Sequence, residues 1–285
     1  MSIKFSFVTV SYNQRQYLSQ AMQSILSQID SDCEYIVMDG GSDDGSAELI
    51  RQYADSLAYW CSQPDNGPAC ALQDAVDRCR GEYLMYLNSD DYLLPGAVAK
   101  IRHAIDKNPG FDVYYGNGFT FDERSSRCFR TYSDRWNTLE YARGCISVFQ
   151  QSSAFRLDRV REVGGFNTDN RTCWDGELLF DIAQAGGRFK RLNDFLAVFR
   201  LHASSISGGQ SRQDEFYRDC ARIAAKHGSA SYTGPGKISS LRKAFRQPGI
   251  TVAKICDAVF GKLDVTQISS VFTSQDVVEM TSDHA

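Results

Sequence analysis

The chain has 285 residues, of which 42% are hydrophobic and 23% are charged, and its formal net charge is −4. This length and composition are typical of a globular α/β domain with an appendage, and they exclude a disordered or collagen-like chain. The acidic balance gives no general attraction to nucleic acid, so we expect no nucleic-acid partner. No apolar run reaches the roughly 18 residues of a spanning helix, and no signal-peptide pattern precedes the first strand, so we expect a cytoplasmic protein.

The nine cysteines are scattered through the chain without any C-x-x-C pair. An odd number in this arrangement does not resemble a disulfide framework or a zinc site. We expect Cys33, Cys61 and Cys79 to be small core hydrophobes, which fits reduced thiols in a cytoplasmic chain.

The first part of the chain alternates β-rich runs with amphipathic segments. We predict strands at 5–10, 34–38 and 82–87 and helices around 18–29, 47–53 and 69–79. Successive strand–helix units predict a parallel sheet with right-handed crossovers. Roughly the first 120 residues therefore form a Rossmann-like, nucleotide-binding half.

The pattern changes after residue 112 to short aromatic runs, which predicts an antiparallel or mixed region. We expect separate strands at 113–115 and 119–121, further strands at 153–157 and 195–199, and a helix at 175–185. Beyond Gly208 the composition shifts again, to a charged helix ending near residue 227 and a basic, apolar segment at 237–263. We interpret 209–285 as a helical C-terminal appendage.

Asp90 and Asp91 directly follow the predicted strand 82–87. Ligands of open α/β sheets bind at the carboxyl ends of strands, and carboxylate oxygens suit Mg²⁺ or Mn²⁺ bridging to a phosphorylated substrate. The alternative is that 88–91 is only a polar turn that leaves a strand.

The loop at 39–46 is rich in Gly and Asp and also follows a predicted strand, next to Ser11, Tyr12 and Asn13. Two neighbouring strand-end loops can form one pocket. The sequence contains neither a dinucleotide fingerprint nor a P-loop, and the loop lacks the ligands of an EF-hand. The Asp39 carboxylate at this place could accept a hydrogen bond from the imide N–H of a uracil base.

Four segments in this order and spacing resemble the family 2 glycosyltransferases, which have a GT-A fold: VTVSYN at 8–13, VMDGGSDDGS at 37–46, QPDNG at 63–67 and LNSDD at 87–91. The likeness extends to VGGF at 163–166, WDGEL at 174–178 and RLH at 200–202, so it covers about 3–207. The resemblance implies a catalytic domain at 1–208 with a mixed central sheet, divided into a nucleotide-sugar half (1–120) and an acceptor half (121–208).

This family implies an inverting transfer of a sugar from a nucleoside diphosphate sugar, with a UDP-sugar favoured, to a hydroxyl of a saccharide or lipid-linked saccharide acceptor in cell-surface or exopolysaccharide synthesis. The implied cofactor is Mn²⁺ or Mg²⁺, which Asp90, Asp91 and His202 would hold. The donor contacts implied are Thr9, Ser11, Tyr12, Asn13, Asp39, Asp65, Gly67, Asn88, Ser89 and Asp90. Asn88 replaces a carboxylate found in many members, and Cys70 and Gln73 replace residues that commonly contact the donor.

Inversion requires a general base, and by family position this is Asp175, with Glu177 as the reserve candidate. Asp175 is also an ordinary helix N-cap by pattern. Trp174 could stack on an acceptor sugar or pack in the core. The pair Gln150–Gln151 resembles an acceptor-side polar pair, and its alternative is a solvated loop.

The segment 237–263 interleaves apolar and basic residues. It could form an amphipathic surface for anionic lipid at the inner face of the membrane, or a helical pair packed on the catalytic domain or on a second subunit. Two other functions remain open: a catalytically silent nucleotide-sugar-binding scaffold, and a sugar-phosphate nucleotidyltransferase, for which the loop at 11–16 lacks glycines.

Overall fold

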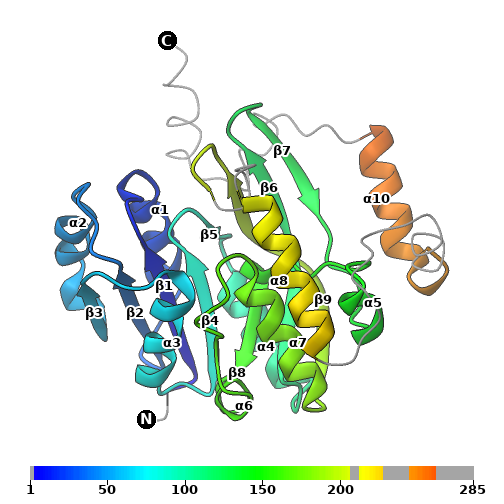
Figure 1. Ribbon diagram of the computed structural model, residues 1–285, viewed down its shortest axis with the longest axis horizontal. Helices are drawn as coiled ribbons and strands as arrows, with labels where there is room; N and C mark the ends of the chain where they lie inside the picture. Colours follow the sequence, from blue (N-terminus) through cyan, green and yellow to red (C-terminus); the bar gives the residue numbers. More distant parts are fainter. Residues whose placement is uncertain (1–2, 206–211, 227–243, 261–285) are drawn as a thin grey trace.

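The computed structural model describes residues 3–205, 212–226 and 244–260. One sheet crosses the molecule with the strand order β3-β2-β1-β4-β8-β6-β9-β5, and β7 pairs with β6 beside this path (Figure 1). The sheet is parallel in its first half and mixed in its second, as the sequence predicts.

The parallel half consists of β1 (Phe5–Ser11), β2 (Cys33–Asp39), β3 (Tyr59–Ser62) and β4 (Tyr83–Asn88), connected by α1 (Arg15–Leu26), α2 (Ser46–Gln52), the 3-10 helix η1 (Ala54–Ser56) and α3 (Pro68–Arg78). The strand β3 was not predicted. In the register of this sheet Ser11 lies opposite Asp39, and Val10 lies opposite Asn88. The loops that follow β1, β2 and β4 therefore meet at one edge.

Helices cover both faces of the parallel half, which explains why its strands are almost continuously apolar. Alternate side chains of β1 enter two different cores: Phe5 and Phe7 pack with Met22 of α1, whereas Val8 packs with Leu72 of α3. Burial on both faces fixes the register of β1, because a slip by one residue would exchange the two sets of side chains.

The second half adds β5 (Tyr92–Leu93), β6 (Val113–Asp122), β7 (Arg127–Thr131), β8 (Ser153–Arg156) and β9 (Phe189–Leu201). The prediction of separate strands at 113–115 and 119–121 was wrong, because β6 runs through both. Gly116 and Gly118 look like breaks in the sequence, but each leaves space for a neighbouring side chain, Leu196 and Phe149 respectively. The predicted boundary at residue 120 falls inside β6.

The remaining helices are α4 (Ala97–Lys107), α5 (Thr138–Ala142), η2 (Gln150–Ser152), α6 (Leu157–Glu162), α7 (Trp174–Gln184), α8 (Gln213–Lys226) and α10 (Pro248–Phe260). Arg222 of α8 pairs with Glu177 of α7 at 2.8 Å, and Asp257 of α10 pairs with Arg130 of β7 at 3.0 Å. Both described helices of the predicted appendage thus pack on the 1–208 part, while the calls for 227–243 and 261–285 lie outside the described residues.

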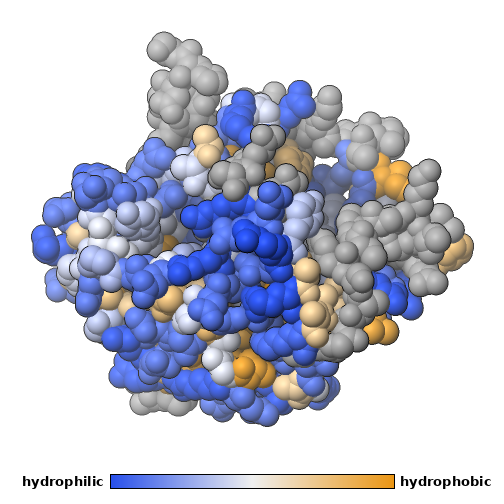
Figure 2. Space-filling model, in the orientation of Figure 1, coloured by the Kyte–Doolittle hydropathy of each residue, from blue (hydrophilic) through white to orange (hydrophobic). Residues whose placement is uncertain are grey.

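Hydrophilic residues cover most of the face in Figure 2, and apolar residues appear near the right-hand edge, where α10 lies in Figure 1. Among the described residues, no helix has the length and apolar character needed to cross a membrane.

Candidate functional site

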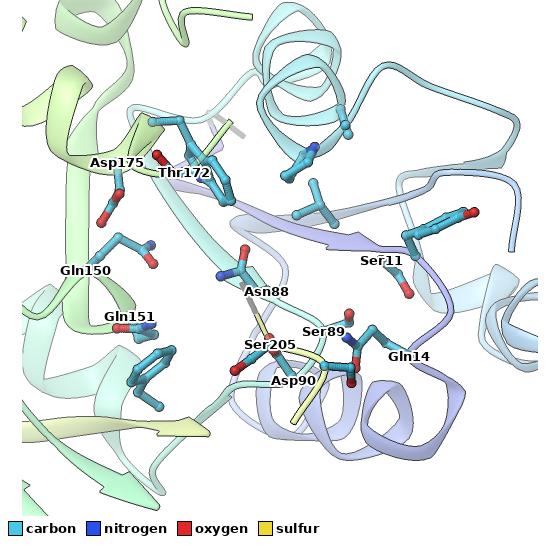
Figure 3. A pocket seen from close by; sticks show the side chains of 18 of the residues that line it. Ser11, Gln14, Asn88, Ser89, Asp90, Gln150, Gln151, Thr172, Asp175 and Ser205 are labelled. Carbon is cyan, nitrogen blue, oxygen red and sulfur yellow. The ribbon is translucent and has the colours of Figure 1, made fainter. Parts of the chain in front are cut away.

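A cavity of about 1250 Å³ opens at the carboxyl ends of the parallel strands. It extends from the loops after β1 and β2, past the end of β4, to β6, β7 and β9 (Figure 3). Of the residues implied by the family resemblance, the cavity is lined by Ser11, Tyr12, Asp65, Gly67, Asn88, Ser89, Asp90 and Asp175. Thr9, Asn13, Asp39, Asp91 and His202 do not line it. Asn13 is exposed, the other four are buried, and the Thr9 hydroxyl bonds with the Tyr35 hydroxyl at 2.8 Å.

The two adjacent carboxylates at the end of β4 have different environments. Asp90 lines the cavity, and its Oδ2 lies 3.0 Å from Nε2 of His202. Asp91 is 0% exposed. Its Oδ2 accepts a hydrogen bond from the Gln151 side chain, and its Oδ1 accepts one from the Arg200 backbone N–H, both at 3.0 Å. Asp91 therefore joins three segments of the chain, and both of its oxygens are engaged within the protein.

Burial strongly raises the pKa of Asp91, and the neighbouring charge of Asp90 raises it further. The hydrogen bonds from Arg200 and Gln151 act in the opposite direction, since they favour the ionised form. A cation bound in the cavity would therefore be coordinated by Asp90 rather than by Asp91.

Aromatic and charged groups hold His202 in place. The ring of Tyr17 lies 4.7 Å from the His202 ring, and its hydroxyl donates to Glu123 at 2.8 Å. The Arg200 guanidinium lies 4.8 Å above the Tyr17 ring and donates to Glu123 at 3.2 Å and to the Asp90 carbonyl at 3.1 Å. On its other side, His202 Nδ1 lies 2.9 Å from the Ser204 hydroxyl. Burial raises the pKa of Tyr17, so this hydroxyl stays a donor.

The donor set beside Asp90 fits a divalent cation. Oδ1 of Asn88 is buried and has no hydrogen-bond partner among the described residues, and Asn88 lines the cavity next to Asp90. A carboxylate, an amide oxygen and an imidazole nitrogen are ligands that Mn²⁺ accepts, and the oxygens also suit Mg²⁺. The replacement of a carboxylate by Asn88 thus keeps an oxygen at this position.

The loop after β2 is shaped by its own polar side chains. Asp39 accepts hydrogen bonds from the Ser42 backbone N–H at 2.9 Å, the Ser42 hydroxyl at 2.5 Å and the Ser62 hydroxyl at 2.6 Å. Asn13, in a left-handed backbone conformation, contacts Ser42 and Asp43. Their observed contacts hold the loop, and its backbone forms the cavity wall.

Tyr12 and Asp65 line the cavity next to the loop after β2. Tyr12 is 64% exposed, which is unusual for a large aromatic residue that lines a cavity. Burial raises the pKa of Asp65, although the Gly67 backbone N–H donates to it at 2.7 Å. Gly41 has φ +80° and lies against the backbone of Pro64, so a side chain is excluded there on two grounds. These residues line this end of the cavity.

Asp175 lies in the first turn of α7 and lines the cavity. The prediction that it is the N-cap was wrong, because α7 already begins at Trp174 and Cys173 occupies the cap position. Figure 3 shows the Asp175 side chain pointing toward Gln150. Burial raises the pKa of Asp175, opposed by a hydrogen bond from the Gly176 backbone. Trp174 packs in the core, as one of its two alternatives expects, and it also lines the cavity, so its stacking on an acceptor sugar stays a prediction.

Glu177 does not line the cavity. It is 1% exposed and accepts hydrogen bonds from Asn167, Asn170, Arg222 and Lys226. Burial opposes its ionisation, but the hydrogen bonds outweigh burial and lower the pKa of Glu177 to about 2. A carboxylate so fully engaged is an anchor for α8 and a poor proton acceptor.

The pair Gln150–Gln151 is buried and lines the cavity, so the alternative of a solvated loop was wrong. Gln150 donates to the Tyr86 carbonyl at 2.9 Å. Cys70 and Gln73 face the other way: the Cys70 thiol points to the Thr168 carbonyl, and Gln73 accepts from the Phe166 N–H at 2.8 Å. The two departures from the family pattern therefore lie outside the cavity.

Several lining residues were not predicted from the sequence. Gln14 follows the Ser11–Asn13 motif and could have been included with it; its Oε1 is buried without a partner among the described residues. Gly40, Gly41 and Pro64 also lie within the quoted motifs at 37–46 and 63–67. The others carry no recognisable sequence signal, because they reach the cavity only through tertiary folding; they include Thr120, Phe129, Thr131, Phe149, Arg171, Thr172, Ser204, Ser205, Arg212 and Glu215.

The family model described as Glycosyl transferase family 2 matches residues 6–161, which is more than half of the chain. The chain belongs to this family. Among curated relatives, a glycosyltransferase of Nostoc sp. is 26% identical over 71% of this chain and 66% of its own length. The putative teichuronic acid biosynthesis glycosyltransferase TuaG of Bacillus subtilis is 26% identical over 76% of this chain and 88% of its own. The Escherichia coli chondroitin synthase is 26% identical, but only 29% of its length is matched.

Solved structures agree with the fold expected for this family 2 glycosyltransferase. Staphylococcus aureus TarS 1–349 in complex with UDP-GlcNAc has a TM-score of 0.63 at 14% identity and covers 99% of this chain and 80% of its own. The mannosyltransferase PcManGT from Pyrobaculum calidifontis, in complex with GDP-Man and Mn²⁺, has a TM-score of 0.61 at 16% identity, covering 99% and 82%. The mixed sheet with its covering helices is that of the GT-A glycosyltransferases, so the prediction of this fold is confirmed.

Proposed function

We propose that this protein transfers a sugar from a nucleoside diphosphate sugar to an acceptor hydroxyl with inversion at the anomeric carbon. The observation that carries the proposal is that one cavity is lined by two separate carboxylates: Asp90, which bonds to the buried imidazole of His202, and Asp175, whose pKa is raised. Asp90 with His202 suits the binding of a diphosphate and its cation, and Asp175 suits proton transfer.

The nucleoside would bind at the end of the cavity formed by Tyr12, Gly40, Gly41 and Asp65. The exposed Tyr12 ring offers a surface for a base, and the free oxygen of Asp65 could accept from a base or ribose donor. Asp39 would not touch the base itself; it would hold the loop that faces the base, through its hydrogen bond from the Ser42 backbone. We favour a UDP-sugar, which the UDP-GlcNAc complex of TarS supports, while the GDP-Man complex of PcManGT makes a GDP-sugar the alternative.

Asp90, Asn88 and His202 would hold Mn²⁺ or Mg²⁺, and the PcManGT complex with Mn²⁺ supports a divalent cation in this fold. The ion, when bound, neutralises charge on the diphosphate leaving group. Asp91 would contribute by holding Gln151 and the Arg200 backbone in place.

Asp175 would take the proton from the acceptor hydroxyl. At the same time, the oxygen of that hydroxyl would bond to the anomeric carbon, and the bond between the anomeric carbon and the diphosphate oxygen would break. A base is most effective when its pKa lies near the working pH, so burial that raises the pKa of Asp175 improves it for this task. Gln150, toward which Asp175 points, would orient the acceptor.

The acceptor would be a saccharide or a lipid-linked saccharide of a cell-surface polysaccharide, which the names of TuaG and chondroitin synthase support. A contact with the membrane through 237–263 and a homo-oligomer remain predictions. Of that segment the structure describes 244–260, where Phe245, Val252 and Ile255 are exposed. Gln247, Lys254 and Asp257 attach the opposite side of α10 to the domain, at 2.7 to 2.9 Å.

The experiment is a measurement of nucleoside diphosphate release from a panel of UDP- and GDP-sugars, with Mn²⁺, Mg²⁺ or EDTA. We expect metal-dependent release that Asp175→Asn removes while nucleoside diphosphate binding persists. Asp169→Asn, an exposed carboxylate before the same helix, is the matched control and should retain activity. Binding without release by the wild type would favour the silent scaffold, and pyrophosphate release from a nucleoside triphosphate and a sugar phosphate would favour the nucleotidyltransferase.

A further inference from the structure

The cavity continues beyond Asp175 and Gln150 to a wall for which the proposed donor has no use. This wall is formed by β6, β7, β9 and the residues before η2, and its members are uncharged: Thr120, Phe129, Thr131, Val148, Phe149, Phe199 and Leu201. The nucleoside end lies on β1, β2 and the loop after β3, near the opposite end of the strand order. A cavity of about 1250 Å³ exceeds the roughly 300–1,000 Å³ usual for one small ligand, so there is room for a second.

Phe129 is the most exposed large apolar residue of this wall, at 46%. Single exposed apolar residues are common on protein surfaces and usually do not indicate a binding site. This one, however, has a fixed direction, because both of its neighbours on β7 are held on the other face of the strand. Cys128 is packed in the core with Phe119 and Phe121, and Arg130 pairs with Asp257 of α10. The alternation of a strand then keeps Phe129 on the cavity side.

Two hydroxyls lie beside the Phe129 ring. Thr120 is directly opposite Phe129 in the β6–β7 register, and the hydroxyls of Thr120 and Thr131 are 2.7 Å apart. One hydrogen is shared between them, so the pair keeps one hydroxyl hydrogen and several lone pairs for a ligand. The second aromatic ring, Phe149, packs against β6 where Gly118 has no side chain, since a Cβ there would overlap the ring. The wall thus combines aromatic surface with hydroxyl groups.

We propose that the wall made by Thr120, Phe129, Thr131 and Phe149 is a subsite for an uncharged sugar ring of the acceptor. The apolar C–H face of the ring would lie on Phe129, and its hydroxyls would bond with Thr120 and Thr131. The inference rests on the proposed function, because that function assigns the other end to the donor. A uronate or phosphate would find no cation among the side chains that β6, β7 and β9 contribute to the lining, so the class expected at this subsite is a neutral hexose or N-acetylhexosamine.

The experiment is saturation-transfer NMR on the full chain with UDP or GDP and Mn²⁺ present. The probes are aryl β-glycosides of glucose, galactose, N-acetylglucosamine, N-acetylgalactosamine and glucuronic acid. We expect at least one neutral glycoside to bind the wild type. Its affinity should fall about tenfold or more in Phe129→Ala and should return in Phe129→Trp. The nucleotide signal should stay unchanged in both variants. Phe245→Ala is the matched control, because Phe245 is 82% exposed just before α10, outside the cavity lining. Melting temperatures of all variants check that the fold is kept.

Two results overturn the subsite. Either no neutral glycoside binds a wild type that does bind nucleotide, or Phe129→Ala binds the glycosides as well as the wild type does. Stronger binding of the glucuronide would overturn the neutral class. Failure of every nucleotide to bind the wild type contradicts the proposed function itself, and with it the description of this wall as an acceptor site.

Discussion

β1, β2 and β4 bring their site residues together through parallel alignment, with Ser11 opposite Asp39 and Val10 opposite Asn88. Asp175 and Phe129, at the other end of the cavity, come from a helix and from a strand beside the main path of the sheet. The first end is built on neighbouring parallel strands, and the second on segments that only the tertiary fold brings together. At either end, substitution of a side chain that bonds to a distant segment should change stability, whereas substitution of a side chain that only lines the cavity should change mainly binding or turnover.

The largest effect is expected from the pH dependence of turnover, because it depends on the ionisation of one group. A base must be ionised, and burial raises the pKa of Asp175. Turnover should therefore fall as pH decreases through this raised pKa, and Asp175→Asn should reduce it by about 10²- to 10⁴-fold at neutral pH. The raised pKa also means that ionised Asp175 destabilises the fold, so Asp175→Asn should keep or slightly raise the melting temperature. A flat pH profile in the wild type would argue against Asp175 as the base.

The adjacent carboxylates Asp90 and Asp91 allow a direct comparison of the two kinds of position. Asp90→Ala should remove most of the metal-dependent part of nucleotide affinity, by about 100-fold, with little change in the melting temperature. Calorimetry of UDP or GDP with Mn²⁺ and with EDTA measures this difference. An unchanged ratio between the two conditions in Asp90→Ala would contradict the metal site.

Asp91→Ala should reduce mainly the stability of the fold, in contrast to Asp90→Ala. It leaves the Gln151 amide and the Arg200 N–H without their acceptor in a place that water does not reach, which costs about 1–3 kcal/mol of folding free energy. Asp91→Asn, which retains one acceptor oxygen, should cost less. Denaturant titration of the two variants gives the comparison, and equal stability of Asp91→Ala and wild type would show that these bonds contribute nothing.

The hydrogen bond from Tyr17 to Glu123 should have a smaller effect, since Tyr17 acts through His202. Tyr17→Phe keeps the ring that packs against His202 but loses the hydroxyl contact at 2.8 Å. We expect about a tenfold loss of Mn²⁺ affinity, the lower range for residues that orient metal ligands. Tyr53→Phe, which removes a surface hydroxyl on the same side of the sheet, is the control. Electron paramagnetic resonance of bound Mn²⁺ measures the affinity without catalysis.

The smallest effect concerns the attachment of α8 through Glu177. Its pKa is lowered from 4.5 to about 2 in the folded protein, so its contribution to stability is present above pH 4.5 and is lost as pH falls toward 2. Part of this gain is screened, because Arg222 and Lys226 are partly exposed. Glu177→Gln should lower the melting temperature at pH 7 and make it less dependent on pH between 5 and 3. An equal pH dependence in both proteins would contradict this account.

The difference between the two ends also explains what the sequence could predict. The strands, helices and strand-end polar residues of the first 90 residues follow from periodicity, because parallel strands place consecutive loops at one edge. Asp175 was found through family position, but its place in the first turn rather than at the cap was not. Nothing in the sequence marks Phe129 or Thr120, since their place in the cavity wall depends on the pairing of β7 with β6. The different roles of Asp90 and Asp91 were likewise invisible, because only burial separates them.

The most direct test of the central claim is thermal unfolding of the purified protein with UDP, GDP, dTDP or CDP, each with Mn²⁺, Mg²⁺ or EDTA. A ligand that binds only the folded state raises the melting temperature, by an amount that grows with the logarithm of its concentration relative to its Kd. We predict a rise with one nucleoside diphosphate, UDP first, that is larger with Mn²⁺ or Mg²⁺ than with EDTA and is lost in Asp90→Ala. No rise with any nucleotide, or a rise that EDTA and Asp90→Ala leave unchanged, would contradict a metal-assisted nucleotide-sugar site in this cavity.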